Sequence, residues 1–177
     1  EGLPMQGVRY FAPNDLGEAV KLLAQYGRQA TILAGGTDLV PKINYYELKP
    51  EVLLYVGKLG LSYIKQVDGT LVIGAGTPLA QILASELVAQ SAPALVHAAK
   101  QHSSVAIRSA ATLGGNIANG SPAADMVIPL IAMDAKLRLV SAKGERFMAI
   151  QDFFVGPGQT KLEPGELIAD VHIPPVK

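Results

Sequence analysis

Two glycine-rich segments carry the residue types in this chain that could do chemistry. "AGGTD" covers residues 34–38, and "TLGGN" covers residues 112–116. Glycine leaves the main chain uncovered, so successive N–H groups can point at one anion, and a threonine hydroxyl can add a donor. Either pair in isolation is more often a tight turn. Two such pairs, each flanked by threonine, could grip the two ends of a pyrophosphate.

The kind of phosphate chemistry is narrowed by what the sequence lacks. There is no GxxxxGK[ST] and no GxGxxG after the first expected strand, so a P-loop or a Rossmann site has little support. No lysine follows either glycine pair closely, so backbone N–H groups and hydroxyls would have to hold a diphosphate. That favours static binding of a cofactor over phosphoryl transfer, which usually recruits a cation or a metal.

Two polar residues follow the second glycine pair. Asp125 lies at the expected start of an apolar helix, where a first-turn acid is stabilised by the helix dipole. Alternatively, its carboxylate accepts hydrogen bonds from ligand hydroxyls, such as those of a sugar or sugar alcohol. Asn119 either bonds a phosphate or takes the left-handed backbone conformation. The residue types alone leave both pairs of alternatives open.

No other residues predict a reactive centre. His97, His102 and His172 are scattered without carboxylates at ligand-like spacing, so no metal site is expected. No Ser-His-Asp set is visible and no residue stands out as an acid or base, so we predict no catalytic residue. The absence of cysteine excludes disulfides, thiolate zinc sites and cysteine-ligated iron–sulfur clusters.

Composition fits one compact domain, or one domain with two lobes that share a core. The chain has 177 residues, 49% of them hydrophobic, and its 15 basic residues balance 15 acidic ones. Without a charge block, neither a nucleic acid nor an anionic membrane is a favoured partner. The first residues do not resemble a signal peptide, and no apolar run reaches about 18 residues. We therefore expect a soluble, cytoplasmic protein.

The elements that must position the glycine pairs divide into two groups. Residues 1–57 predict a small βαβ lobe, in which Asp15 caps a helix and Gly27 ends it. The short apolar strand "ATILA" then leads directly into the first glycine pair, and residues 51–56 read as the next strand.

Residues 58–177 predict a larger lobe. Its expected elements are strand 71–76, a helix capped by Thr77 with Pro78 at its first position, helix 91–102, the second glycine segment as a turn, helix 121–135 and an extended tail. The tail consists of short runs, some with period-two alternation, which fit antiparallel strands better than a doubly wound parallel sheet. The fold class expected is therefore α+β.

In their wider context, "ILAGGTDL" and "IRSAATLGGNIANGSPAADMVIPL" resemble the flavin-binding subunit, or middle domain, of the molybdenum hydroxylases. These include xanthine dehydrogenase, aldehyde oxidoreductase and the medium subunit of aerobic carbon monoxide dehydrogenase. The likeness runs from about Met5 to Pro174 and includes "GTLVIGAGTPLAQI" and "GELIADVHIP". It implies the two-lobed FAD-binding fold of the vanillyl-alcohol-oxidase and peptidoglycan-precursor-reductase type. The larger lobe would contain an antiparallel sheet, and FAD would lie extended between the lobes.

The resemblance implies cofactor contacts residue by residue. The first glycine loop would hold the pyrophosphate through Ile32, Leu33, Ala34, Gly35, Gly36, Thr37, Asp38 and Leu39. The second would contribute Thr112, Leu113, Gly114, Gly115 and Asn116. Asp125 stands where the family's acid binds ribityl or ribose hydroxyls, and Ile168 where an apolar residue packs on the flavin. His102 falls where some relatives place an aromatic residue near the cofactor, although a surface or helix-end role is open.

The function implied is electron transfer. In the family, hydroxylation occurs at a molybdenum cofactor in another subunit, and electrons pass through two iron–sulfur clusters to FAD and then to an acceptor. A molybdenum-cofactor subunit and a [2Fe–2S] subunit are the expected partners. Relatives continue beyond the "HIP" strand into a C-terminal domain of roughly a hundred residues, a common domain size, which is missing here. Two alternatives follow: an assembly domain that has lost flavin binding, or a stand-alone flavin oxidoreductase of the same fold.

The chain also departs from the family pattern next to the second glycine pair. Ser109 and Ala110 stand where many relatives have Asn-Arg. We therefore expect any cofactor contact made by that arginine to be missing here.

Overall fold

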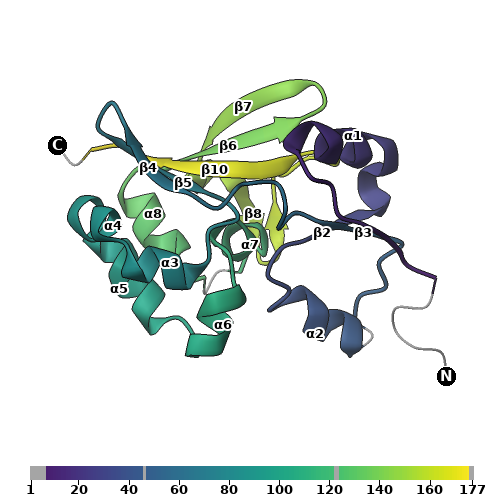
Figure 1. Cartoon of the computed structure of the whole chain (residues 1–177), viewed down its shortest axis with the longest axis horizontal. Coiled ribbons are helices and arrows are strands. Elements are labelled where there is room, and N and C mark those ends of the chain that lie inside the picture. The colour runs from purple at the N-terminus through teal and green to yellow at the C-terminus, as the bar shows by residue number, and fades with distance from the viewer. Residues whose placement is uncertain (1–6, 46, 122–123, 176–177) are drawn as a thin grey trace.

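Two main sheets organise the described part of the chain, which comprises residues 7–45, 47–121 and 124–175 of a computed structural model. The three-stranded sheet lies on the right of Figure 1, and the five-stranded sheet crosses its upper half. The second glycine segment and the loop after β2 both lie between these two parts of the molecule. The predicted boundary between residues 57 and 58 falls after the last strand of the smaller sheet and stays a prediction.

The smaller sheet is parallel, with strand order β1-β3-β2. Its elements are β1 (Arg9–Phe11), α1 (Leu16–Tyr26), the short 3-10 helix η1 (Gly27–Gln29), β2 (Ala30–Leu33), α2 (Leu39–Asn44) and β3 (Val52–Tyr55). Asp15 caps α1 as predicted, because its Oδ1 accepts from the N–H of Glu18 at 2.8 Å. Gly27 ends α1 with φ of 51°, a value that favours glycine. The predicted βαβ opening is confirmed.

The larger sheet is antiparallel, with order β4-β5-β10-β6-β7. Its strands are β4 (Ile64–Val67), β5 (Thr70–Gly74), β6 (Lys136–Ser141), β7 (Gly144–Ala149) and β10 (Leu167–Ile173). The remaining elements are α3 (Leu79–Ala84), α4 (Glu86–Ser91), α5 (Pro93–Gln101), α6 (Val105–Ala110), α7 (Leu113–Ala118), α8 (Val127–Ala132), α9 (Ile150–Phe153), β8 (Phe154–Gly156) and β9 (Gln159–Thr160). The predicted antiparallel sheet is confirmed.

The core has two parts, and the smaller one joins the two sheets. The larger cluster fills the space between the five-stranded sheet and the helices beneath it in Figure 1, with α3, α5 and α8 among them. The smaller cluster combines Leu23 of α1 and Leu54 of β3 with Val140 of β6 and Ala169 of β10. Because α1 packs on both sheets, burial of this apolar surface fixes the sheets relative to each other.

Thr77 is not the helix cap that the sequence predicts. Its side chain is fully buried, and Oγ1 accepts from the N–H of Tyr63 at 3.1 Å and donates to the Tyr63 carbonyl at 3.2 Å. Pro78 is the N-cap of α3 rather than its first helical residue. A buried hydroxyl must find partners, and here the segment before β4 supplies them.

Two further boundaries differ around the second glycine pair. The predicted turn at residues 112–116 is the start of a helix, α7, because Thr112 caps it and Leu113 and Ile117 share a buried helical face. The predicted helix 121–135 begins only at Val127. Residues 122–123, within the predicted helix, lie outside the described residues.

Candidate functional site

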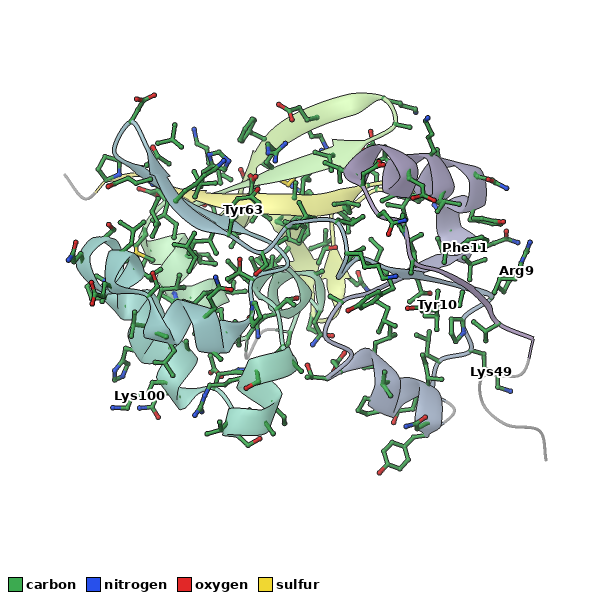
Figure 2. All side chains as sticks on the ribbon, in the orientation of Figure 1. Arg9, Tyr10, Phe11, Lys49, Tyr63 and Lys100 are labelled. Carbon is green, nitrogen blue, oxygen red and sulfur yellow. The ribbon has the colours of Figure 1, made fainter. Side chains whose placement is uncertain are left out.

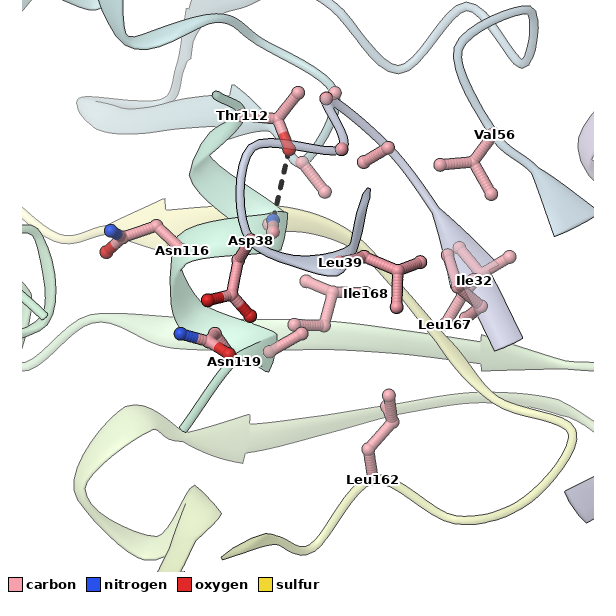
Figure 3. A pocket seen from close by; sticks show the side chains of 18 of the residues that line it. Ile32, Asp38, Leu39, Val56, Thr112, Asn116, Asn119, Leu162, Leu167 and Ile168 are labelled. Atoms are coloured by element: carbon pink, nitrogen blue, oxygen red, sulfur yellow. Dashed lines mark hydrogen bonds between the residues drawn. The ribbon is translucent and has the colours of Figure 1, made fainter. Parts of the chain in front are cut away.

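A cleft of about 810 Å³ lies between the two parts of the molecule, where it is lined by segments far apart in the sequence. Its walls are loop 34–38, α2, α7, the end of α6 and residues 162–168. Figure 3 shows these segments facing one another, with polar side chains on one side and aliphatic ones on the other. This size lies within the range usual for small-molecule sites.

Loop 34–38 presents main-chain donors to this cleft. Across the described ranges, the N–H groups of Gly35, Gly36, Thr37 and Asp38 have no protein acceptor, while the Gly36 carbonyl accepts from Val40 at 3.0 Å. Gly36 has φ of 72°, which only glycine adopts readily. Unpaired amides that line a cleft and precede a helix are suited to an anion. The expected bare backbone is therefore present in this loop.

Gly35 has a second role, which is to let the two parts of the molecule touch. A Cβ at this position would lie 1.9 Å from the carbonyl oxygen of Ala110, at the end of α6. No side chain fits at such a distance, so the main chains must meet directly. The contact brings loop 34–38 against the residues that lead into α7.

The second glycine segment does not present bare amides, which corrects the expectation from sequence. The N–H of Leu113 donates to Thr77, that of Gly114 to Ala75 and that of Asn116 to Thr112, at 3.0, 2.8 and 3.0 Å to the carbonyl oxygens. The Gly115 N–H donates to the Thr112 hydroxyl at 3.1 Å. The first-turn donors of α7 are therefore all used, two by Thr112 and two by the main chain of Ala75 and Thr77, so α7 meets the cleft through side chains.

Asn116 and Asn119 are the polar side chains that α7 turns toward the cleft (Figure 3). Oδ1 of Asn116 is buried and has no hydrogen-bond partner among the described residues, a costly arrangement that a ligand donor would relieve. Asn119 has φ of −61°, so the left-handed alternative is wrong, and its Oδ1 lies 3.3 Å from Nζ of Lys42.

Lys42 is a cleft residue that the sequence interpretation missed. It lies on α2, four residues after Asp38, and its Nζ is 2.6 Å from the Asp38 carboxylate. No lysine immediately follows the glycine pair. Lys42 lies one helical turn after Asp38, however, so its side chain is on the same face of the helix and reaches the loop. The i,i+4 spacing of Asp38 and Lys42 is the signal in the sequence that could have indicated it.

Asp125 and His102 form a pair at the edge of the cleft. Nδ1 of His102, which lines the cleft, lies 2.9 Å from Oδ2 of Asp125. Asp125 precedes α8, so the first-turn alternative is wrong; its side chain is 48% exposed and it is not among the lining residues. His102 follows α5, and its carbonyl accepts from Arg108 at 3.1 Å, which fixes the backbone there.

The opposite wall is apolar and is held by an ion pair. Ile32, Leu39 and Ile168 line it together with Val56, Leu162 and Leu167. Glu166 receives Nε and Nη2 of Arg146 at 2.7 and 2.8 Å. Burial alone would raise the pKa of Glu166, but the hydrogen bond from Arg146 brings it below its ordinary value. The carboxylate therefore stays charged and fixes the segment that carries Ile168.

Three predicted positions do not line the cleft among the described residues: Leu33, Leu113 and Asp125. Leu113 is fully buried in the core beneath α7. The other predicted contact residues all line it: Ile32, Ala34, Gly35, Gly36, Thr37, Asp38, Leu39, His102, Thr112, Gly114, Gly115, Asn116, Asn119 and Ile168.

A buried polar network supports the wall formed by Leu61 and Gly76. Asp170 of β10 is 2% exposed and accepts hydrogen bonds from Arg138, His172 and the Tyr63 hydroxyl. Tyr63 directly precedes β4 and lies beside β10 (Figure 2). Burial, then its hydrogen bond to Asp170, raises the pKa of Tyr63 to about 12. The N–H of Gly76 donates to the carbonyl of Leu61, which lies two residues before Tyr63. By fixing Tyr63, the network therefore holds this wall in place.

Chemically, the cleft combines main-chain donors for an anion, amide and hydroxyl side chains, and an aliphatic wall for a flat apolar group. Residues 5–176 match the family described as the FAD binding domain in molybdopterin dehydrogenase. The chain therefore belongs to this family of FAD-binding domains. The orphan Asn116 oxygen and the bare loop 34–38 are features that fit a dinucleotide with a diphosphate bridge.

Known proteins support the same assignment. The chain is 35% identical over 170 residues to the xanthine dehydrogenase FAD-binding subunit of Escherichia coli O157:H7, covering 94% of this chain and 57% of that protein. It is 39% identical over 174 residues to the nicotinate dehydrogenase FAD-subunit of Eubacterium barkeri, covering 96% and 59%. The chain thus spans less than two thirds of the length of these relatives.

Solved structures confirm the predicted fold. Carbon monoxide dehydrogenase from Hydrogenophaga pseudoflava superposes with a TM-score of 0.93 at 34% identity, covering 96% of this chain and 60% of that one. Alkyldihydroxyacetonephosphate synthase superposes with a TM-score of 0.54 at 16% identity over 93% of this chain and 30% of that chain, which shows a shared fold alone. In the described ranges, no helix has the length and apolar character needed to cross a membrane.

Proposed function

We propose that this chain is the FAD-binding electron-transfer part of a molybdenum-containing hydroxylase. The observation that carries the proposal is the loop of unpaired amides at residues 35–38, which shares one cleft with the side chains of α7. Similarity to FAD subunits of xanthine and nicotinate dehydrogenases over more than nine tenths of the chain supports it.

We assign the pyrophosphate to loop 34–38, where the four amides from Gly35 to Asp38 would donate to its oxygens. On and next to α7, the side chains of Thr112, Asn116 and Asn119 would contact the cofactor. Gly114 and Gly115 would let the cofactor approach the main chain closely. Asp125 would accept from hydroxyls of the ligand while it orients His102. Ile32, Leu39 and Ile168 would pack on the apolar rings.

FAD, when bound, supplies the redox chemistry, whereas the protein supplies binding, orientation and electrostatics. The residues of this chain therefore act by holding the cofactor: the loop binds its charge, the aliphatic wall excludes water, and the Glu166–Arg146 pair keeps that wall in position. We assign no catalytic acid or base and no metal ligand.

We further propose that the chain works beside a molybdenum-cofactor subunit and a [2Fe–2S] subunit in the cytoplasm. The molybdenum substrate site and the iron–sulfur clusters would lie in these partners, so that electrons reach this chain from them. The relative named carbon monoxide dehydrogenase medium chain, from Hydrogenophaga pseudoflava, is 36% identical over 166 residues and has a name that implies further subunits.

The test is purification of the chain under native conditions from its own organism. We expect flavin absorbance near 450 nm, FAD in the released cofactor, and co-purifying chains that bring molybdenum and iron. Addition of the complex's substrate should bleach the flavin band. A colourless chain that binds no added FAD contradicts the proposal, and a yellow chain that oxidises a small molecule without metal partners favours a stand-alone oxidoreductase.

A further inference from the structure

Lys42 links loop 34–38 to the end of α7 on the polar side of the cleft. Its Nζ is 2.6 Å from Oδ2 of Asp38, in the loop, and 3.3 Å from Oδ1 of Asn119, at the end of α7. Asp38 follows β2 of the smaller sheet and Asn119 follows α7, and both side chains lie on the polar side of the cleft (Figure 3). The ammonium group therefore lies at the cleft rather than in bulk solvent.

Among the described residues, the hydrogen bonds of Lys42 leave one of its donors unused. A lysine ammonium has three N–H donors. Across the described ranges, Asp38 and Asn119 are its acceptors. The side chain is 43% exposed, so the remaining donor is accessible from the cleft. A ligand oxygen next to the free amides of the loop is the acceptor that this arrangement leaves room for.

The charges around the loop also require a cation. Asp38 is half exposed and lies beside the unpaired amides, so its carboxylate would repel a diphosphate placed there. The cleft's other carboxylates, Glu163 and Glu166, both pair with Arg146, at the opposite wall. Lys42 is positioned to offset Asp38 and to attract the diphosphate at once.

We propose that Lys42 is a diphosphate-binding residue of this cleft, which keeps its contact with Asp38 and donates its free N–H to a phosphate oxygen of FAD. The proposal rests on the assignment of the cleft to FAD. None of the family positions carried over from the sequence is a lysine, so the contact follows from the placement of Lys42 in the structure and not from the resemblance. It predicts that Lys42 acts on ligands through their diphosphate and not through their rings.

The test compares ligands that differ in the diphosphate. FAD, ADP and riboflavin are titrated into the wild-type chain and the variants Lys42→Met and Lys42→Arg, by flavin fluorescence and by calorimetry for ADP. We expect K42M to weaken FAD and ADP about tenfold, as for loss of one charge-assisted hydrogen bond, with riboflavin changed less than about twofold. K42R should restore most of the loss.

A matched control removes a positive charge from the same part of the molecule but away from the cleft. Lys49 is exposed and lies on the outer side of the small lobe in Figure 2. Lys49→Met should leave all three affinities within about twofold of wild type, since an exposed charge is screened by salt. Equal losses in K49M and K42M would reduce the effect to net charge and overturn the proposal.

The Asp38→Asn background separates direct binding from simple neutralisation of Asp38. If Lys42 contacts the diphosphate, D38N/K42M binds ADP more weakly than D38N by a factor close to that of K42M in wild type. If the double variant binds ADP as tightly as D38N does, Lys42 only offsets the charge of Asp38, and the proposal is overturned. If the wild-type protein binds neither FAD nor ADP, the proposed function is overturned as well. If the wild type binds FAD and K42M binds FAD and ADP with unchanged affinity, only this inference is overturned.

Discussion

Loop 34–38 and segment 112–116 contain the same residue types, two adjacent glycines next to a threonine, but the structure uses them differently. In loop 34–38, the N–H groups from Gly35 to Asp38 have no protein acceptor in the described ranges. In segment 112–116, the N–H groups from Leu113 to Asn116 all donate within the protein. The first segment is therefore prepared for a ligand anion, and the second mainly for packing.

The two segments share one property, a glycine that touches another main chain. Gly35 meets the carbonyl of Ala110, and Gly114 meets Ala75, with no space for a Cβ in either case. A glycine pair that lines the cleft thus has two properties that substitution can separate. One glycine allows two main chains to approach closely, and the neighbouring N–H groups are either free or bonded within the protein.

The largest effect is expected for Gly35→Ala. A Cβ 1.9 Å from the Ala110 carbonyl oxygen forces the loop and α6 apart, which should lower the free energy of unfolding by about 3 kcal/mol and abolish measurable FAD binding. Urea unfolding and flavin titration measure both quantities. Wild-type stability in this variant would contradict the close contact between the loop and α6.

Gly114→Ala should have a smaller effect, confined mainly to stability. Its Cβ would lie 2.6 Å from that of Ala75 and 2.9 Å from the Ala75 carbonyl oxygen, so the two main chains must move apart, although less than at Gly35, and we expect a loss of about 2 kcal/mol. FAD affinity of the folded fraction should fall much less than in Gly35→Ala, because the amide of Gly114 is not offered to ligand. Parallel losses of affinity in the two variants would break the contrast between the segments.

Asn116→Leu tests whether α7 meets the ligand through its side chains. The Asn116 oxygen is buried and has no partner in the part of the chain that the structure describes, so a near-isosteric apolar side chain should keep or raise the stability of the ligand-free chain. FAD should bind about tenfold more weakly, which corresponds to roughly 1.4 kcal/mol. Thermal unfolding with and without FAD separates the two effects, and a stability loss without an affinity change would contradict this assignment.

The smallest effects come from the two threonines. Thr112→Val removes the cap of α7 and should lower stability by about 1 kcal/mol. Thr37→Val should change stability by less than about 0.5 kcal/mol, since the exposed hydroxyl has no partner in the described ranges, but it should weaken FAD binding severalfold. Chemical unfolding and titration of both variants give the comparison, and a reversed order would contradict the separate roles of the segments.

Much of the fold follows from local signals. Asp15 and Gly27 bound α1 because a cap and a C-terminal glycine act on their own helix. The start of α7 was missed although its signal is local: Thr112 followed by Leu113 and Ile117 at helical spacing. The cap predicted at Thr77 failed for a different reason, since its hydroxyl bonds Tyr63, which a sequence window around α3 does not contain.

The sequence by itself determined the fold class, the order of the first elements and two segments that line the cleft, because these depend on residue type and short-range spacing. Only the tertiary structure decided which amides remain free. The N–H of Gly114 donates to the carbonyl of Ala75, whereas Gly35 contacts the carbonyl of Ala110 and keeps its N–H free among the described residues. It also decided that Lys42 reaches Asn119, 77 positions away. Hydrogen-bond partners and contacts between lobes depend on how distant segments are packed, and that information is absent from local periodicity.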